Sequence, residues 1–193
     1  MSGITRININ ENTMGWRMDI AREHEPCLNA IYREIFPTLA DGDEVIHVEK
    51  DSVMARYDHL EGIDVILSHG EGMKMTLQEK LLTYHEDTLT VEVRKNSGKN
   101  GAWFYCTAQL YFVGYNRKYK AGAPNNVLSL DNWILVDFAM LKIETLNGNV
   151  PWKINHNQRD NRRAVFQYVH FDHIPKNCVI ARKNDIPKNL FGF

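Results

Sequence analysis

The chain has 193 residues, a length that suits one domain of ordinary size. With 44% hydrophobic and 24% charged residues, it has the composition of a globular protein with a full core, which excludes a disordered chain, a collagen-like repeat and a coiled coil. Lys and Arg number 23 against 24 Asp and Glu, so the net charge of −1 gives no attraction of the whole molecule to phosphate or membrane. Any nucleic-acid binding must come from a local basic patch.

The cysteines and the apolar runs indicate a cellular compartment. Cys27, Cys106 and Cys178 are widely spaced and form no CxxC pair, which argues against a disulfide framework and a structural zinc site. No apolar run reaches about 18 residues, and the first residues contain no apolar signal core. We therefore expect a cytoplasmic protein that does not engage a membrane.

The N-terminal part predicts one helix. Between residues 16 and 36, apolar residues recur at helical spacing and form one stripe. The members of this stripe are Ile20, Leu28, Ile31 and Ile35. Pro26 either divides the helix or begins its main part, and Pro37 ends it. Residues 44–57 are ambiguous, with a short strand at 45–48 as one interpretation.

Four strands are predicted next. Residues 62–67 and 73–82 form a hairpin around a glycine-containing turn. A third strand is predicted at 88–94 and a fourth at 110–115, after a loop rich in Gly, Asn and Lys. One helix followed by a run of strands predicts a mixed α/β fold, with a central mixed sheet flanked by helices.

The C-terminal part is less regular. Residues 133–143 form either a buried strand or a helix, and periodicity alone does not decide between them. Another strand is predicted at 165–171 and a short element around 179–180. Because no internal repeat or interdomain linker occurs, residues 1–193 are expected to form a single domain.

The predicted hairpin brings together residues suited to a metal site. Asp64 lies on its first strand, and Gln78, Glu79 and Lys80 lie on its second. Strand alternation places Gln78 and Lys80 on one face and Glu79 on the other. A carboxylate, a second oxygen ligand and the main-chain carbonyl of Glu79 can hold a hard cation such as Mg²⁺. Lys80 can orient an attacking water or balance the charge of a phosphate.

Three segments together resemble a known family. They are GIDVI at residues 62–66, TLQEK at 76–80 and LTVEV at 89–93, and they follow a predicted helix. Their order is similar to the core of the PD-(D/E)xK nuclease superfamily, the restriction-endonuclease-like fold. In that family an aspartate on one strand and an acid-x-lysine motif on its neighbour bind Mg²⁺ and cleave phosphodiesters, within a core of helix, three strands, helix and strand. The resemblance implies such a core at about residues 16–115 and a C-terminal elaboration at 116–193.

Two positions depart from the family pattern. Ile63 stands where the family name has proline, and Gln78 stands where it has an acid. A Gln-x-Lys motif resembles that of Mrr-like restriction enzymes, in which the amide oxygen takes the place of the carboxylate. Glu79 or Glu92 is an alternative source of the missing negative charge, with Glu34 on the predicted helix as a further candidate.

The resemblance implies a metal-dependent nuclease that hydrolyses DNA. Asp64, Gln78 and Lys80 are then the catalytic residues. Asp64, Gln78 and Glu79 are the implied ligands of Mg²⁺ or Mn²⁺, and Glu92 is an auxiliary candidate. Basic residues on two loops are expected to contact the DNA backbone, although ordinary solvated surface is the alternative interpretation for each group. These residues are Arg94, Lys95, Lys99, Arg117 and Lys118.

Other functions stay open from the sequence. One is a catalytically inactive nuclease-fold module that binds DNA or assists assembly, and another is a protein-interaction component with no nucleic-acid role. A homodimer is also open. The HFDH run at residues 170–173 has poor geometry for a metal site and is expected to be an exposed strand end. His85 is a minor candidate for an auxiliary base.

Overall fold

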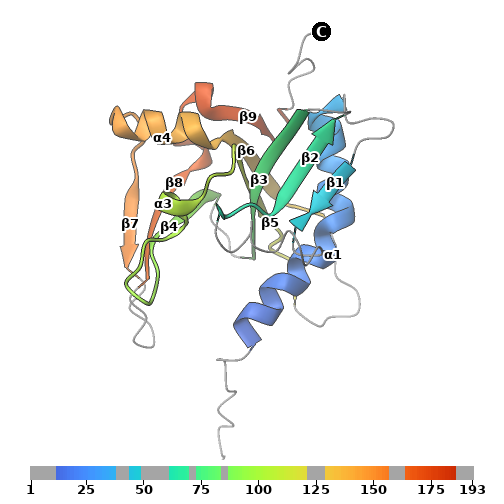
Figure 1. The fold of residues 1–193 in the computed structure, drawn as a ribbon, viewed down its shortest axis with the longest axis horizontal. Helices are drawn as coiled ribbons and strands as arrows, with labels where there is room; N and C mark the ends of the chain where they lie inside the picture. The colour runs from blue at the N-terminus through green and yellow to red at the C-terminus, as the bar shows by residue number, and fades with distance from the viewer. Residues whose placement is uncertain are drawn as a thin grey trace, which may run out of the picture.

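The structure is a computed structural model that describes residues 12–37, 44–48, 61–69, 73–83, 87–120, 129–156 and 164–185 (Figure 1). The helices are α1 (Asn12–Ile35), α3 (Ala102–Tyr105) and α4 (Phe138–Leu146), with short 3₁₀ turns at Phe171–His173 and Lys176–Cys178. The strands are β1 (Glu44–His47), β2 (Val65–His69), β3 (Met73–Leu82), β4 (Thr88–Arg94), β5 (Leu110–Tyr115), β6 (Asn132–Asp137), β7 (Lys153–His156), β8 (Val165–His170) and β9 (Val179–Arg182). No helix among the described residues is both long and apolar enough to cross a membrane.

The strands form two sheets. The larger has the order β1-β2-β3-β5-β6-β9, and the smaller has the order β4-β8-β7. All neighbours are antiparallel except β3 and β5, which are parallel. The expected mixed α/β fold with a mixed central sheet is confirmed.

The helix α1 covers one face of the large sheet because its apolar stripe is continuous. Leu28, Tyr32 and Ile35 are fully buried and belong to one core cluster with Leu77 of β3 and Phe112 of β5. Pro26 lies inside the helix and does not end it.

A second core cluster lies on the other face of the large sheet. Leu89 of β4 and Val169 of β8 join Val113 of β5 there, together with Leu141 of α4. Figure 1 shows α1 on one side of the large sheet and the small sheet with α4 on the other. Alternating residues of β3 therefore face two different layers.

The place of residues 88–94 differs from the expectation. The segment is a strand, but it pairs with β8 in the small sheet and does not extend the sheet of the hairpin. The position beside β3 is taken by β5, in parallel. A parallel pair needs a crossover connection, and residues 83–109 supply it, with β4 and α3 inside the crossover.

Residues 133–143, left open between strand and helix, contain both. The strand β6 ends at Asp137, where α4 begins. The Asp137 carboxylate accepts a hydrogen bond from the main-chain N–H of Met140 at 2.8 Å, as an N-cap does. This N-cap therefore sets the point within the apolar run at which the strand ends and the helix begins.

A buried histidine ties α1 to the segment after β5. His24 is fully buried, and its Nδ1 donates to the carbonyl of Ile20 at 2.8 Å. Its Nε2 therefore accepts from Asn116 Nδ2, also at 2.8 Å. The Asn116 oxygen accepts the main-chain N–H of Lys118, which fixes the orientation of this amide. Burial lowers the pKa of His24, so the ring is neutral.

This histidine predicts a loss of stability in mild acid. Because folding lowers the His24 pKa below 6.5, the unfolded chain binds the proton first as the pH falls. The stability is thus present above pH 6.5 and is lost below it, by at most about 1.4 kcal/mol per pH unit from this one group. Urea unfolding between pH 7.5 and 5 should show a steeper decline for the wild type than for His24→Gln. Parallel curves for the two proteins would contradict this prediction.

Candidate functional site

Asp64 lies directly before β2 and faces β3. Its main-chain N–H donates to the carbonyl of Leu77 at 2.8 Å, which continues the hairpin ladder by one residue. Its Oδ2 accepts the main-chain N–H of Glu79 at 2.7 Å and a hydrogen bond from Gln78 Nε2. The hairpin therefore brings Asp64 and Gln78 into direct contact.

Three polar groups converge at this contact. Besides Asp64 Oδ2, the Gln78 Nε2 atom lies 3.2 Å from the main-chain carbonyl oxygen of Glu79. An amide can turn so that its oxygen takes the place of its nitrogen. Three oxygen atoms would then face one another, an arrangement that repels unless a cation or a proton lies between them.

The donors at this point suit a hard divalent cation. Mg²⁺ prefers oxygen ligands, keeps several waters and is commonly held by only one or two carboxylates together with substrate phosphates. Asp64 supplies a carboxylate, Gln78 an amide oxygen once turned, and Glu79 a carbonyl. Among the described residues, no group of three or more His, Cys, Asp or Glu side chains could hold a metal ion. A cation here would therefore depend on Asp64 for its charge.

The Glu79 side chain points away from this point, as strand alternation requires. Its carboxylate accepts a hydrogen bond from the hydroxyl of Tyr32 on α1. Tyr32 is fully buried, and burial together with the negative charge of Glu79 raises the pKa of Tyr32 well above its ordinary value. The Tyr32 hydroxyl thus stays protonated and holds Glu79 on the α1 side of the sheet, leaving its carbonyl beside Gln78.

Lys80 shares the Gln78 face and reaches the small sheet. Its Nζ donates to the carbonyl of Thr90 on β4 at 2.8 Å and lies 5.5 Å from the centre of the Phe166 ring. Glu92 is half-buried, two residues beyond Thr90 on the same strand, and is paired in register with Phe166. The Thr90 carbonyl therefore holds the Lys80 ammonium against β4.

Two hydrogen bonds that were not predicted from the sequence hold the segment before Asp64 in place. Cys106 donates from Sγ to the carbonyl of Gly62 at 3.2 Å, and burial raises the pKa of this thiol to about 11, so it keeps its proton. Lys142 of α4 donates to the carbonyl of Cys106 at 2.9 Å, with its Nζ 4.4 Å from the centre of the Phe138 ring. The glycine next to Ile63 and Asp64 was the only local signal of this packing.

Gly62 is needed at this position for two reasons. Its φ of +62° lies in the left-handed region, which L side chains rarely adopt. A Cβ added there would also lie 2.9 Å from Gln78 Oε1 and 3.1 Å from Cys106 Cβ. The Gly62 backbone therefore packs directly on the candidate ligand Gln78.

The first basic group lies at the end of β4 and in the turn between β4 and α3. Arg94 and Lys99 are exposed, whereas Lys95 places its Nζ 4.3 Å from the centre of the Tyr105 ring. All three residues are thus on or near the surface at the carboxyl end of β4.

The second basic group follows β5. Arg117 forms an ion pair with Asp87, and Lys118 is exposed. Thr88, at the start of β4, donates its N–H to the Tyr115 hydroxyl. The two basic groups therefore lie at opposite ends of β4, with the contact between Thr90 and Lys80 between them.

The histidine candidates do not add to the site. The His170 and His173 rings lie edge to face, with their centres 6.0 Å apart. Within the part of the chain that the structure describes, these two histidines belong to no group of His, Cys, Asp or Glu that could hold a metal ion. His85 lies outside the described residues. The candidate site thus consists of Asp64, Gln78, Glu79 and Lys80.

Comparisons with known proteins identify no relative. No protein-family model, curated protein or solved structure matches this chain.

Proposed function

We propose that the protein is a metal-dependent nuclease that hydrolyses DNA phosphodiester bonds. The observation that carries this proposal is the convergence of the Asp64 carboxylate, the Gln78 amide and the Glu79 carbonyl at one point. Lys80 lies on the same strand face as Gln78, and basic residues lie at both ends of the neighbouring β4.

The strand order supports membership of the PD-(D/E)xK superfamily as part of the same proposal. The helix α1 is followed by β1, β2 and β3, and then by α3 and β5 in the same sheet. This order agrees with a core of helix, three strands, helix and strand if β4 is an insertion. Asp64 then directly precedes the second strand of the core, and Gln78 and Lys80 lie in the third.

In this mechanism the chain supplies the ligands and a donor. Asp64, the turned Gln78 amide and the Glu79 carbonyl would hold Mg²⁺ or Mn²⁺, which when bound supplies Lewis-acid chemistry and an acidified water. A lysine ammonium has three donors, so Lys80 can keep its bond to Thr90 and still donate to a phosphate oxygen or to the attacking water. The bond from Tyr32 to Glu79 holds β3 in place on the opposite face.

Lys80→Met should reduce metal-dependent cleavage of supercoiled plasmid DNA by about a hundredfold, because it removes a donor to the developing negative charge. The matched control is Lys74→Met, an exposed lysine on the same strand, which should cleave like the wild type. Cleavage by the wild type should require Mg²⁺ or Mn²⁺ and stop in EDTA. Cleavage that persists in EDTA, or in Lys80→Met at the wild-type rate, would overturn this mechanism.

The basic residues should contribute unequally to DNA affinity. Lys118→Ala and Lys99→Ala each remove an exposed cation, whereas Arg117 is already paired with Asp87. The logarithm of the association constant for DNA falls linearly with the logarithm of the salt concentration, and each phosphate contact makes this slope steeper by about 0.9. Fluorescence anisotropy with labelled duplex DNA should therefore show a shallower slope for the two lysine variants and a smaller change for Arg117→Ala. Equal slopes in all three variants and the wild type would count against these contacts.

A second candidate is an inactive nuclease-fold module that binds DNA. It is favoured by one observation: Gln78 Nε2 donates to Asp64 Oδ2, so the carboxylate has a partner without any cation. This module would bind DNA with the salt dependence described above but would neither cleave it nor bind a divalent cation through Asp64.

A further inference from the structure

An exposed aromatic ring lies next to the first basic group. Phe104 in α3 is 57% exposed, and the other Phe, Tyr and Trp side chains that the structure describes are half-buried or buried. A single exposed apolar side chain is ordinary on a protein surface. The surroundings of Phe104 therefore decide whether its ring has a role.

The turn between β4 and α3 is folded back on β4 by main-chain hydrogen bonds. The N–H of Lys95 donates to the carbonyl of Lys99 at 2.8 Å, and the N–H of Gly101 donates to the carbonyl of Val93 at 2.9 Å. Gly101 packs so closely on β4 that an added Cβ would lie 2.3 Å from the carbonyl oxygen of Glu92. The turn therefore has a defined shape in the absence of any ligand.

The helix α3 is anchored on both sides of Phe104. Trp103 packs edge to face on Phe138, with ring centres 5.7 Å apart. On the other side, Cys106 donates from Sγ to the carbonyl of Gly62 at 3.2 Å. Gly62 in turn packs directly on the candidate site. The exposed ring is therefore held in place two residues from a contact with the segment that carries the candidate site.

The segment that contains Phe104 is basic throughout. Between residues 93 and 109 the chain has Arg94, Lys95 and Lys99 and no Asp or Glu, although the whole chain has a net charge of −1. The Lys95 Nζ lies 4.3 Å from the centre of the ring of Tyr105, the residue next to Phe104. Positive charge thus lies beside an exposed aromatic ring, which is the combination that binds single-stranded nucleic acid.

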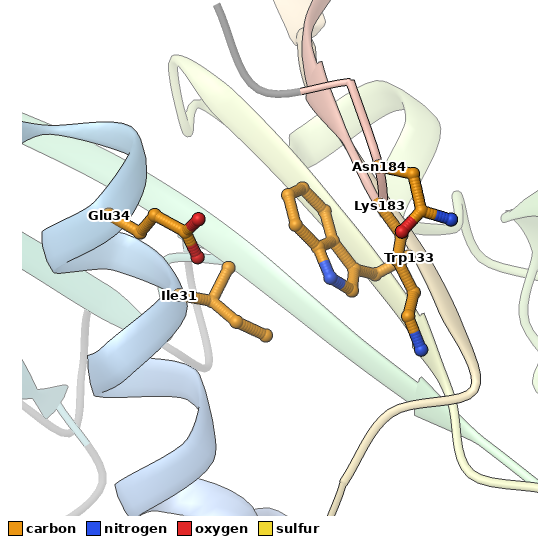
Figure 2. A pocket seen from close by; sticks show the side chains of 5 residues that line it. All are labelled: Ile31, Glu34, Trp133, Lys183 and Asn184. Atoms are coloured by element: carbon orange, nitrogen blue, oxygen red, sulfur yellow. The ribbon is translucent and has the colours of Figure 1, made fainter. Parts of the chain in front are cut away.

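A groove on the α1 side of the large sheet lacks this combination (Figure 2). It is lined by Ile31, Glu34, Trp133, Lys183 and Asn184. An acid and a base line it together, and the Lys183 Nζ donates to the carbonyls of Leu130 at 2.6 Å and Asp131 at 2.9 Å. A polyanion is therefore attracted to the turn before α3 rather than to this groove.

We propose that Phe104 stacks on an unpaired base of the DNA substrate while the basic turn contacts the backbone of the same strand. This inference rests on the proposed function, because it takes DNA as the polyanion. A base in a duplex is covered on both faces by its neighbours, whereas a base in a single strand leaves a face free for an aromatic ring. The inferred substrate is therefore DNA that is single-stranded where it crosses α3.

The test is fluorescence anisotropy with a labelled single-stranded oligonucleotide and the matching duplex, with EDTA present so that no cleavage occurs. Phe104→Ala should weaken binding of the single strand at least about fivefold, because stacking is lost. Its binding of the duplex should equal that of the wild type. The matched control is Leu146→Ala, which truncates an apolar side chain that is 88% exposed on α4 and should bind both DNAs like the wild type.

Two further variants separate stacking from simple apolar contact. Phe104→Leu should lose affinity for the single strand as Phe104→Ala does, because leucine is apolar but has no π face, whereas Phe104→Trp should keep it. The inference is overturned if Phe104→Ala or Phe104→Leu binds the single strand as tightly as the wild type does. Binding of phosphatidylserine vesicles in place of DNA would equally overturn it.

These outcomes are independent of cleavage. Asp64→Asn should bind the single strand in EDTA at least as tightly as the wild type does, because it removes a negative charge. A protein that binds single strands through Phe104 but never cleaves them would contradict the nuclease and leave the Phe104 contact intact. A protein that cleaves DNA with Mg²⁺ but binds single strands equally well without the Phe104 ring would contradict only the Phe104 contact.

Discussion

Asp64→Asn is expected to lower metal-dependent DNA cleavage by about a thousandfold while the protein stays folded. Among the described residues, Asp64 supplies the one side-chain carboxylate that contacts Gln78 and the Glu79 main chain at this point, and the substitution removes its charge. The loss of a charged ligand costs several kcal/mol of transition-state stabilisation, and about 1.4 kcal/mol corresponds to a factor of ten in rate. The side-chain oxygen of asparagine can still accept the N–H of Glu79, so the hairpin should persist.

Initial rates on supercoiled plasmid at saturating Mg²⁺ measure this effect. The matched control is Asp172→Asn. Asp172 is an exposed acid in the 3₁₀ turn after β8, where it pairs with Arg182, so this variant should cleave at the wild-type rate. Circular dichroism verifies the fold of both variants. An Asp64→Asn protein that cleaves within threefold of the wild type would remove Asp64 from the mechanism.

Gly62→Ala is expected to lower the free energy of unfolding by about 2–5 kcal/mol. Placing an L side chain at a left-handed φ costs about 1–2 kcal/mol. The added methyl group would also lie 2.9 Å from Gln78 Oε1 and 3.1 Å from Cys106 Cβ, and such overpacking costs about 1–3 kcal/mol. Because the clash falls on Gln78, cleavage should fall as well at temperatures where the variant is folded.

The chain offers a control that separates strain from crowding. Gly98 has φ of +80°, and a methyl group there would meet nothing within 4 Å. Gly98→Ala should therefore show the conformational cost alone and leave cleavage unchanged. Urea unfolding of both variants measures the difference. Equal losses of stability would mean that the packing of Gly62 on Gln78 and Cys106 contributes nothing.

The elements that could be predicted from the sequence are those in which apolar residues recur at helical or strand spacing. The helical stripe from Leu28 to Ile35 predicted a buried face, and the alternation in 73–82 predicted that Glu79 points away from Gln78. The contact of Asp64 with Gln78 followed from the hairpin, because a short turn fixes which residues lie opposite each other.

The parts that could not be predicted depend on distant partners. Residues 88–94 have the same alternation whichever sheet they join, and their partner β8 lies more than seventy residues further along the chain. The Lys80 contact with Thr90 depends on that choice. Likewise, nothing local to Cys106 or Lys142 indicates that they hold Gly62, because the contact joins three separate segments.

The most direct test of the account is a calorimetric titration of the protein with Mn²⁺, without DNA, for the wild type and Asp64→Asn. The convergence of Asp64, Gln78 and the Glu79 carbonyl predicts one Mn²⁺ per chain in the wild type and at least about tenfold weaker binding in the variant. Absence of binding in the wild type, or equal affinity in the two proteins, would contradict a metal site at Asp64.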